Sequence, residues 1–191
     1  MKYKVVSIIV PVVVVAIVVA GIAYAVSRDS GGADALTVNG QSVSQLTVNQ
    51  ELGALTSLPS ITKTTPGAVS SDVGTGWLTS RVAAIAIEQL FADNRVSLTA
   101  KQRAKFVKQL RKQYPGLPRS SEAVIVDVTV ADSLLSDALG GADGVAAALT
   151  KQMRKLDVSV DPKYGRWVRA RAQVCPVTGC PAAASASSSG G

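Results

Sequence analysis

The sequence predicts a mostly helical domain that follows one membrane-spanning helix. A long run close to the N-terminus, residues 5–25, is apolar apart from Ser7. Further along the chain, apolar residues recur three or four positions apart, which is the spacing of one face of an α-helix. Aromatic residues make up only 4% of the 191 residues. Ala, Val and Leu must therefore build the core, and such cores are usually helical.

Residues 1–26 are expected to form the membrane segment. As a helix with a rise of 1.5 Å per residue, the apolar run spans about 31 Å, the thickness of a bilayer's hydrocarbon core. Lys2 and Lys4 precede it, which predicts a cytoplasmic N-terminus and an extracytoplasmic domain. Residues 23–25, Ala-Tyr-Ala, also have the form of a cleavage site, so secretion after signal-peptide cleavage is the alternative. The run exceeds the roughly 7–15 residues of a signal peptide's apolar region, which favours a retained single-pass anchor.

A polar, Gly-containing spacer, residues 27–34, separates this segment from a folded domain expected over residues 35–168. The domain opens with a predicted short strand, residues 35–40, which ends in the pair Asn39-Gly40. Because Asn-Gly is a strong turn signal, we expect the chain to turn at this point.

The first helix of the domain is predicted over residues 45–58. Ser44 has the position of its N-cap, and Val43 and Val48 are placed to form a hydrophobic staple around that cap. Pro59 is expected to end the helix, since proline disrupts helical hydrogen bonding.

A loop rich in Thr, Ser, Gly and Pro, residues 60–76, leads to two further predicted helices, residues 77–94 and 99–114. One broad face of the first is apolar at helical spacing and is expected to be buried. Thr99 opens the second, and Gln102 three residues later completes a capping-box pattern.

The last third of the domain contains one ambiguous stretch, residues 122–139. Residues 124–130 have strong strand propensity, yet apolar positions across the whole stretch also fit one helical face, and we predict a helix. A short helix, residues 143–155, and a short strand, residues 156–160, follow. Pro, Ala, Ser and Gly dominate residues 169–191, which are expected to form a disordered tail.

Charge and residue types narrow the possible functions. The 20 basic and 13 acidic residues give a net charge of +7, which fits an anionic neighbour such as lipid headgroups, a cell-wall polymer or an acidic client. The chain contains no histidine, which removes the Ser-His-Asp arrangement and most catalytic zinc sites. We therefore expect no enzyme activity, no cofactor and no metal. Nucleic acid is not expected as a partner, because aromatic residues for base stacking are sparse and the domain is exported.

The only two cysteines, Cys175 and Cys180, lie five positions apart. Outside the cytoplasm a local disulfide that closes this short loop is expected. Free thiols in a loose tail and a redox role are the alternatives. A metal site is disfavoured, since two cysteines without other ligands cannot complete a tetrahedron.

Three stretches, taken in order, resemble the N-terminal peptide-binding domain of SurA-type periplasmic chaperones and PrsA-type foldases, in the short form found in actinobacterial envelope proteins. Residues 36–44, Leu-Thr-Val-Asn-Gly-Gln-Ser-Val-Ser, match the family's opening strand, turn and capped helix. Residues 77–99 match its middle, with Trp77-Leu78 leading an aliphatic helix. Residues 158–167, Val-Ser-Val-Asp-Pro-Lys-Tyr-Gly-Arg-Trp, match its closing strand and turn.

The resemblance implies a non-catalytic, chaperone-like module that binds unfolded or extended polypeptide. In such a domain the terminal strands, here about 35–39 and 156–160, pair as a small two-stranded element, and the helices form a cradle with an apolar inner face. Foldases of the family also carry a parvulin prolyl-isomerase domain with active-site histidines. We expect no such domain in this sequence, so the isomerase activity is not expected here. The alternative for each candidate binding residue is an ordinary place in the core. The candidates are Trp77, Leu78, Phe91, Phe106 and Tyr114.

The helix predicted over residues 99–114 carries a second candidate site. No acidic residue lies between Asp93 and Glu122 in the sequence, so its basic residues form either a solvated face or a surface for anionic partners. The alternative function is therefore an envelope adaptor that binds anionic lipid or wall polymer through this helix. The candidate residues are Lys101, Arg103, Lys105, Lys108, Arg111 and Lys112.

Overall fold

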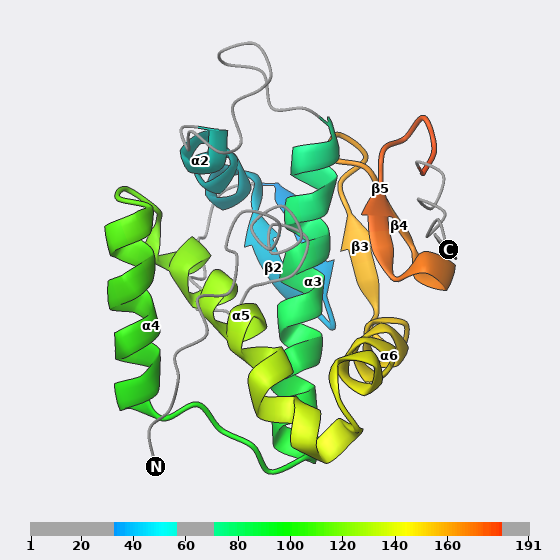
Figure 1. Ribbon diagram of the computed structural model, residues 1–191. Coiled ribbons are helices and arrows are strands. Elements are labelled where there is room, and N and C mark those ends of the chain that lie inside the picture. Colours follow the sequence, from blue (N-terminus) through cyan, green and yellow to red (C-terminus); the bar gives the residue numbers. More distant parts are fainter. Residues whose placement is uncertain (1–32, 57–70, 181–191) are drawn as a thin grey trace, which may run out of the picture.

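The computed structural model describes residues 33–56 and 71–180 (Figure 1). The helices are α2 (Gln45–Thr56), α3 (Ser71–Asp93), α4 (Ala100–Gln113), α5 (Arg119–Leu139), α6 (Ala142–Met153) and the short 3-10 helix η1 (Arg169–Arg171). The strands are β1 (Asp34–Val38), β2 (Gln41–Ser44), β3 (Val158–Val160), β4 (Arg166–Val168) and β5 (Gln173–Cys175). The described part is mostly helical, as predicted, with two small antiparallel sheets. α3 runs through the middle, α4 lies at one edge beyond α5, and α6 and β3–β5 lie on the other side of α3 (Figure 1).

The two ends of the domain are joined in one sheet. β1 pairs antiparallel with β3, so that Leu36 lies opposite Val160 and Val38 opposite Val158. Leu36 and Val38 are buried, and Val158 and Val160 pack against the same apolar cluster. The predicted pairing of the opening and closing strands is confirmed.

The prediction of only two strands is wrong. β2 adds a third strand on the other edge of β1, giving the order β2-β1-β3. Asn39 and Gly40 connect β1 to β2 with positive φ angles of 49° and 79°. A two-residue hairpin turn of this kind needs positive φ at both central positions, which explains the Asn-Gly pair. β4 and β5 form a further two-stranded sheet.

α2 begins where its cap predicts. The Oγ of Ser44 accepts a hydrogen bond from the backbone N–H of Thr47, at 3.2 Å. Val43 and Val48 on either side of the cap are buried in the main apolar cluster. The end of the predicted helix, after Thr56, lies outside the described residues.

α3 differs from its prediction at its start and in its burial. It begins at Ser71 rather than Trp77, so residues 71–76, which were predicted as loop, are helical. Thr75 in this segment is buried, and its hydroxyl donates to the carbonyl of Ser71 at 2.8 Å. Every residue from 77 to 87 is buried, whereas the spacing predicted one buried face. A helix that is covered all round is an internal element.

Two apolar clusters share α3. The first surrounds its N-terminal half and includes residues of β1, β2, α2 and β5. The second lies at its C-terminal half, where α5 and α6 pack. The first contains Trp77 and Leu78, and the second contains Phe91.

α4 is covered far less than α3. Its capping box is formed as predicted: Thr99 accepts from the backbone N–H of Gln102 at 3.3 Å, and Gln102 accepts from the backbone N–H of Thr99 at 3.0 Å. No residue of α4 is fully buried. Its apolar side rests on α5 as the outermost layer of the domain.

α5 resolves the ambiguous stretch as a helix, as predicted. Val124, Asp127, Ala131 and Leu135 are buried and lie three or four positions apart, which is the spacing of one helical face. Gly140 ends the helix in the left-handed conformation, with φ 81°. The next helix, α6, starts directly after Gly141, one residue before its predicted start, and Asp143 lies in its first turn.

The disordered tail was predicted over residues 169–191, but the folded domain continues past residue 169. Residues 169–175 form η1 and β5, and Trp167 of β4 lies opposite Val174 of β5. The backbone N–H of Val174 donates to Oγ1 of Thr79 in α3 at 2.8 Å. These tertiary contacts outweigh the local composition. Residues 181–191 lie outside the described residues.

The predicted membrane segment, residues 1–26, also lies outside the described residues, as does most of the spacer. Within residues 33–56 and 71–180, no helix has both the length and the hydropathy needed to cross a bilayer. β1 starts at Asp34, the last residue of the predicted spacer.

Candidate functional site

Three of the five candidate polypeptide-binding residues are part of the core. Trp77, Leu78 and Phe91 are 1%, 0% and 8% exposed. All three lie on α3, whose buried stretch is wider than its apolar spacing indicated. The prediction that they line an accessible apolar face is wrong, because α2, α5 and the strands cover them.

The other two candidates are Phe106, which lies on α4, and Tyr114, which is the C-cap residue of α4, and both are half-buried. Phe106 packs against the second apolar cluster and Tyr114 against the first, with Leu110 between them touching both. Partial burial raises the pKa of the Tyr114 hydroxyl. Because α4 has no fully buried residue, these side chains keep apolar surface in contact with solvent.

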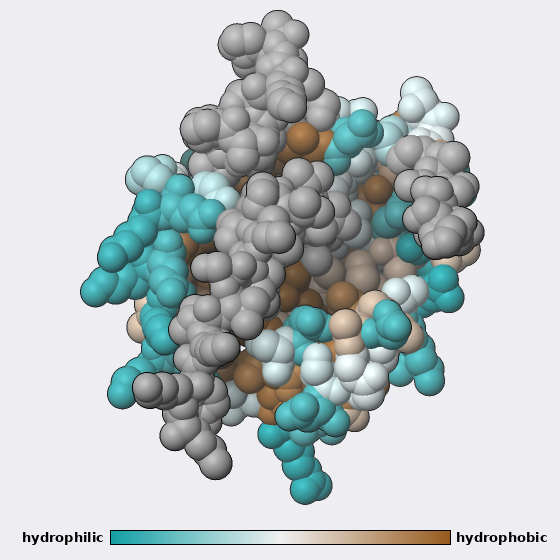
Figure 2. Space-filling model, in the orientation of Figure 1, coloured by the Kyte–Doolittle hydropathy of each residue, from teal (hydrophilic) through white to brown (hydrophobic). Residues whose placement is uncertain are grey.

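Four of the six candidate basic residues form one exposed row on α4, the lysine stripe. Its members lie four, three and four positions apart, so they share one face of the helix. Figure 2 shows hydrophilic side chains projecting along the edge of the molecule that α4 forms in Figure 1. The lysine stripe consists of Lys101, Lys105, Lys108 and Lys112, all exposed.

The two arginines of α4 have another role, because both pair with carboxylates of α5. Arg103 donates to Asp127, with 3.2 Å between Nη1 and Oδ2, and Arg111 donates to Glu122, with 2.7 Å between Nη2 and Oε2. The two carboxylate side chains are only 1% and 6% exposed, whereas the side chains of Arg103 and Arg111 are 39% and 54% exposed. These pairs attach α4 to α5, so the two arginines have carboxylate partners within the domain, whereas the prediction treated all six basic residues alike.

Burial and ion pairing shift the pKa values of these side chains in opposite directions. Burial raises the pKa of Asp127, and the opposing effect of Arg103 is smaller. The hydrogen bond and charge of Glu122 raise the pKa of Arg111. Asp127 is thus a carboxyl whose desolvation outweighs the attraction of its partner.

A buried ion pair inside the domain was not predicted. Arg81 of α3 and Glu51 of α2 are 2% and 1% exposed. Nε of Arg81 donates to Oε2 of Glu51 at 2.9 Å, and Nε1 of Trp77 donates to the same oxygen at 2.9 Å. The sequence held a signal for this pair: Glu51 is the only charged residue in α2, and Arg81 is the only one in the aliphatic middle of α3.

Cys175 and Cys180 are bonded to each other, with their Cα atoms 4.8 Å apart. Cys175 is fully buried at the end of β5. The bond therefore closes the loop that follows β5, as predicted. This arrangement is that of a structural cross-link.

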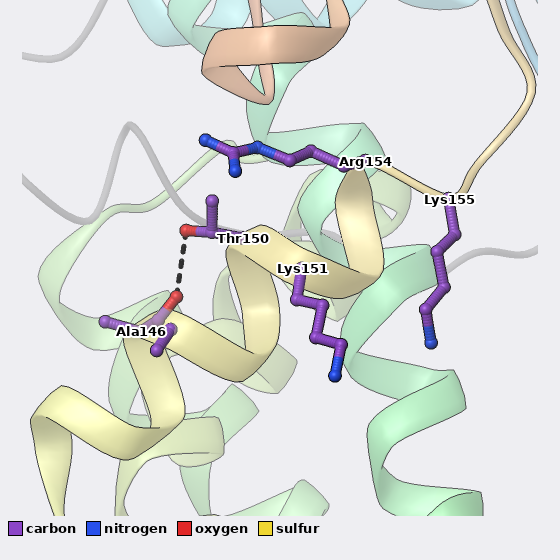
Figure 3. A pocket seen from close by; sticks show the side chains of 6 residues that line it. Ala146, Thr150, Lys151, Arg154 and Lys155 are labelled. Atoms are coloured by element: carbon purple, nitrogen blue, oxygen red, sulfur yellow. Dashed lines mark hydrogen bonds between the residues drawn. The ribbon is translucent and has the colours of Figure 1, made fainter.

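Neither a metal-ligand cluster nor an enclosed pocket with converging charges is found among the described residues. No group of three or more Cys, Asp or Glu side chains in residues 33–56 and 71–180 has the arrangement of a metal site. An open hollow of about 520 Å³ lies along α6. Figure 3 shows that Arg154 points away from Lys151 and Lys155, so the cations around it do not converge on one position. The hollow is lined by Ala146, Ala147, Thr150, Lys151, Arg154 and Lys155.

Comparison of the chain with protein families, with characterised proteins and with solved structures finds no significant match.

Proposed function

We propose that the chain is a non-catalytic, membrane-anchored module that binds unfolded or extended polypeptide outside the cytoplasm, with a SurA N-terminal-like fold. The observation that carries the proposal is the pairing of β1 with β3. The resemblance implied this pairing, whereas composition and periodicity name no partner for either strand. Because a fold alone does not determine function, the proposal also needs a surface on which a polypeptide could bind.

α4 supplies the surface on which a polypeptide would bind. Phe106, Leu110 and Tyr114 form a half-buried apolar row beside α5. An extended chain lying along this row would cover the apolar surface that α5 leaves open, with a gain of about 25 cal/mol for each Å² removed from water. Burial of this kind is non-directional, which suits clients of varied sequence.

The proposal is tested by suppression of aggregation. The full chain in lipid nanodiscs, at several-fold molar excess, is mixed with a client protein that aggregates when its disulfides are reduced, and light scattering is followed. We expect scattering to fall with the wild-type chain. We also expect prolyl-isomerase activity to stay at background.

A matched pair of variants locates the binding surface. Phe106→Ser with Tyr114→Ser removes two half-buried aromatic side chains from α4 and is expected to weaken suppression. Leu46→Ser with Val177→Ser removes two exposed large apolar residues elsewhere on the described surface and is expected to leave suppression unchanged. Absence of suppression by the wild type, or an equal loss in both variants, contradicts the proposal.

A further inference from the structure

The lysine stripe faces directly away from the domain. Phe106 and Leu110 of α4 contact the apolar clusters, and the stripe lies on the opposite face of the same helix at 100° per residue. From Lys101 to Lys112 the row is about 17 Å long at 1.5 Å per residue. It is straight and convex, with no concavity in which a small ligand could be enclosed.

The ion pairs of α4 fix this orientation. Arg103 and Arg111 bind carboxylates of α5 that are almost completely buried. Two pairs two turns apart hold the helix against rotation about its own axis. The arginines thus attach α4 to α5, and the lysines lie on the outer side of α4.

The stripe has no counter-charge in the described part of the chain. The ion pairs found in residues 33–56 and 71–180 are Glu51–Arg81, Asp127–Arg103 and Glu122–Arg111, and none includes a stripe lysine. α4 itself contains no acidic residue. The four like charges repel one another, which raises the electrostatic free energy of the domain. An external anionic surface would lower that free energy.

We infer that the lysine stripe binds the surface of a bilayer that contains anionic lipid. A flat array of phosphates matches a straight, convex row of compact ammonium charges, which need no fixed hydrogen-bond geometry. The tether makes the bilayer the nearest anionic surface: the eight residues between Ala25 and β1 reach at most about 30 Å when fully extended. The inference uses the membrane anchor of the proposed function but not its polypeptide binding.

The test is amine footprinting of the full chain on two kinds of vesicle, phosphatidylcholine alone and phosphatidylcholine with phosphatidylglycerol at seven to three. Acetylation rates of individual lysines are read by peptide mass spectrometry. We expect the stripe lysines to react more slowly on the anionic vesicles, by on the order of fivefold. Salt at about 1 M, where the Debye length is about 3 Å, should restore the neutral-vesicle rates.

Lys151 of α6 and Lys155, two residues after its end, are the internal controls, because both are exposed and α6 lies at the opposite side of the molecule from α4 (Figure 1). Their rates should be equal on the two kinds of vesicle. Equal rates for the stripe lysines, or the same slowing at all six positions, overturns the inference. A stripe that is slowed by soluble polyphosphate but not by anionic vesicles also overturns it, in favour of a polymer partner.

Variants separate this inference from the proposed function. A reporter variant, Gln109→Lys, places a further lysine on the same helix. Replacement of the four stripe lysines by Glu should abolish the salt-sensitive slowing of acetylation at this reporter. Suppression of client aggregation should persist in that variant if the apolar row acts alone. Flotation on neutral vesicles reads the membrane anchor separately, and failure there would count against the anchor rather than against the stripe.

Discussion

α3 and α4 are neighbours in sequence but differ in what surrounds them. α3 is covered on all sides from residue 77 to residue 87, and its single charge there, Arg81, is paired inside the domain. α4 has no fully buried residue and carries six basic side chains, four of them without a carboxylate partner in the described residues. The charge in the middle of α3 is therefore paired in the interior, whereas the lysines of α4 face outward. Stability should therefore depend on α3, and binding on α4.

The largest effect is expected from breaking the buried ion pair. Glu51→Leu leaves the Arg81 guanidinium inside the domain without its carboxylate and removes the acceptor of the Trp77 indole. Loss of one partner from a buried pair costs about 3–5 kcal/mol, so we expect urea denaturation to show a decrease of that size in the free energy of unfolding.

The double variant Glu51→Leu with Arg81→Met is the control for this prediction. Replacing both members with apolar side chains removes the unpaired charge, and much of the lost stability should return. A decrease of less than about 1 kcal/mol in the free energy of unfolding of Glu51→Leu alone would mean that the ion pair is accessible to water.

A matched pair of leucines tests the difference in burial between the two helices. Leu78 in α3 is fully buried, whereas Leu110 in α4 is half-buried. We expect Leu78→Ala to cost about 3 kcal/mol and Leu110→Ala about 1 kcal/mol, measured by the same denaturation experiment. Equal costs would contradict the assignment of α4 to the outermost layer.

The cap of α4 is expected to have a smaller effect. Thr99→Ala removes the acceptor for the Gln102 backbone N–H, and loss of such a cap costs about 1 kcal/mol. Because few contacts hold α4, the loss should be local. Hydrogen exchange should accelerate at α4 amides and change little at those of α3, and uniform acceleration would argue against an independently opening α4.

The smallest effect concerns pH. Burial raises the pKa of Asp127, so between the ordinary Asp pKa, about 4, and the raised value the folded chain binds more protons than the unfolded chain. The contribution of Asp127 to stability therefore falls as the pH rises through that window. Asp127→Asn cannot titrate, and the wild type should lose stability relative to this variant over the same range. A wild type that gains stability there would show that Arg103 outweighs burial.

Local signals predicted the elements well where cap and turn chemistry were specific. Ser44, Thr99 with Gln102, and Asn39-Gly40 all act as their residue types indicate. The polar start of α3 and the strand β5 were missed. Their residues lack periodicity, and each is held by tertiary contacts, such as the hydrogen bond from Val174 to Thr79, that no local pattern contains.

The candidate site was predicted less well, for two physical reasons. An apolar stripe in the sequence does not reveal how many neighbours cover it, so Trp77 and Leu78 were placed on an open face although they are core. A run of basic residues does not reveal which of them have partners from another helix. Arg103 and Arg111 find theirs on α5, and only the structure separates them from the lysines.

Site-specific photo-crosslinking tests the central claim most directly. Benzoylphenylalanine in place of Phe106 or Tyr114 keeps an aromatic side chain on α4, and the same residue in place of the exposed Val177 samples a surface outside the apolar row. With a reduced, unfolded client, the account predicts crosslinks from both α4 positions and few from position 177. Crosslinks of equal yield at all three positions, or at position 177 alone, would contradict it.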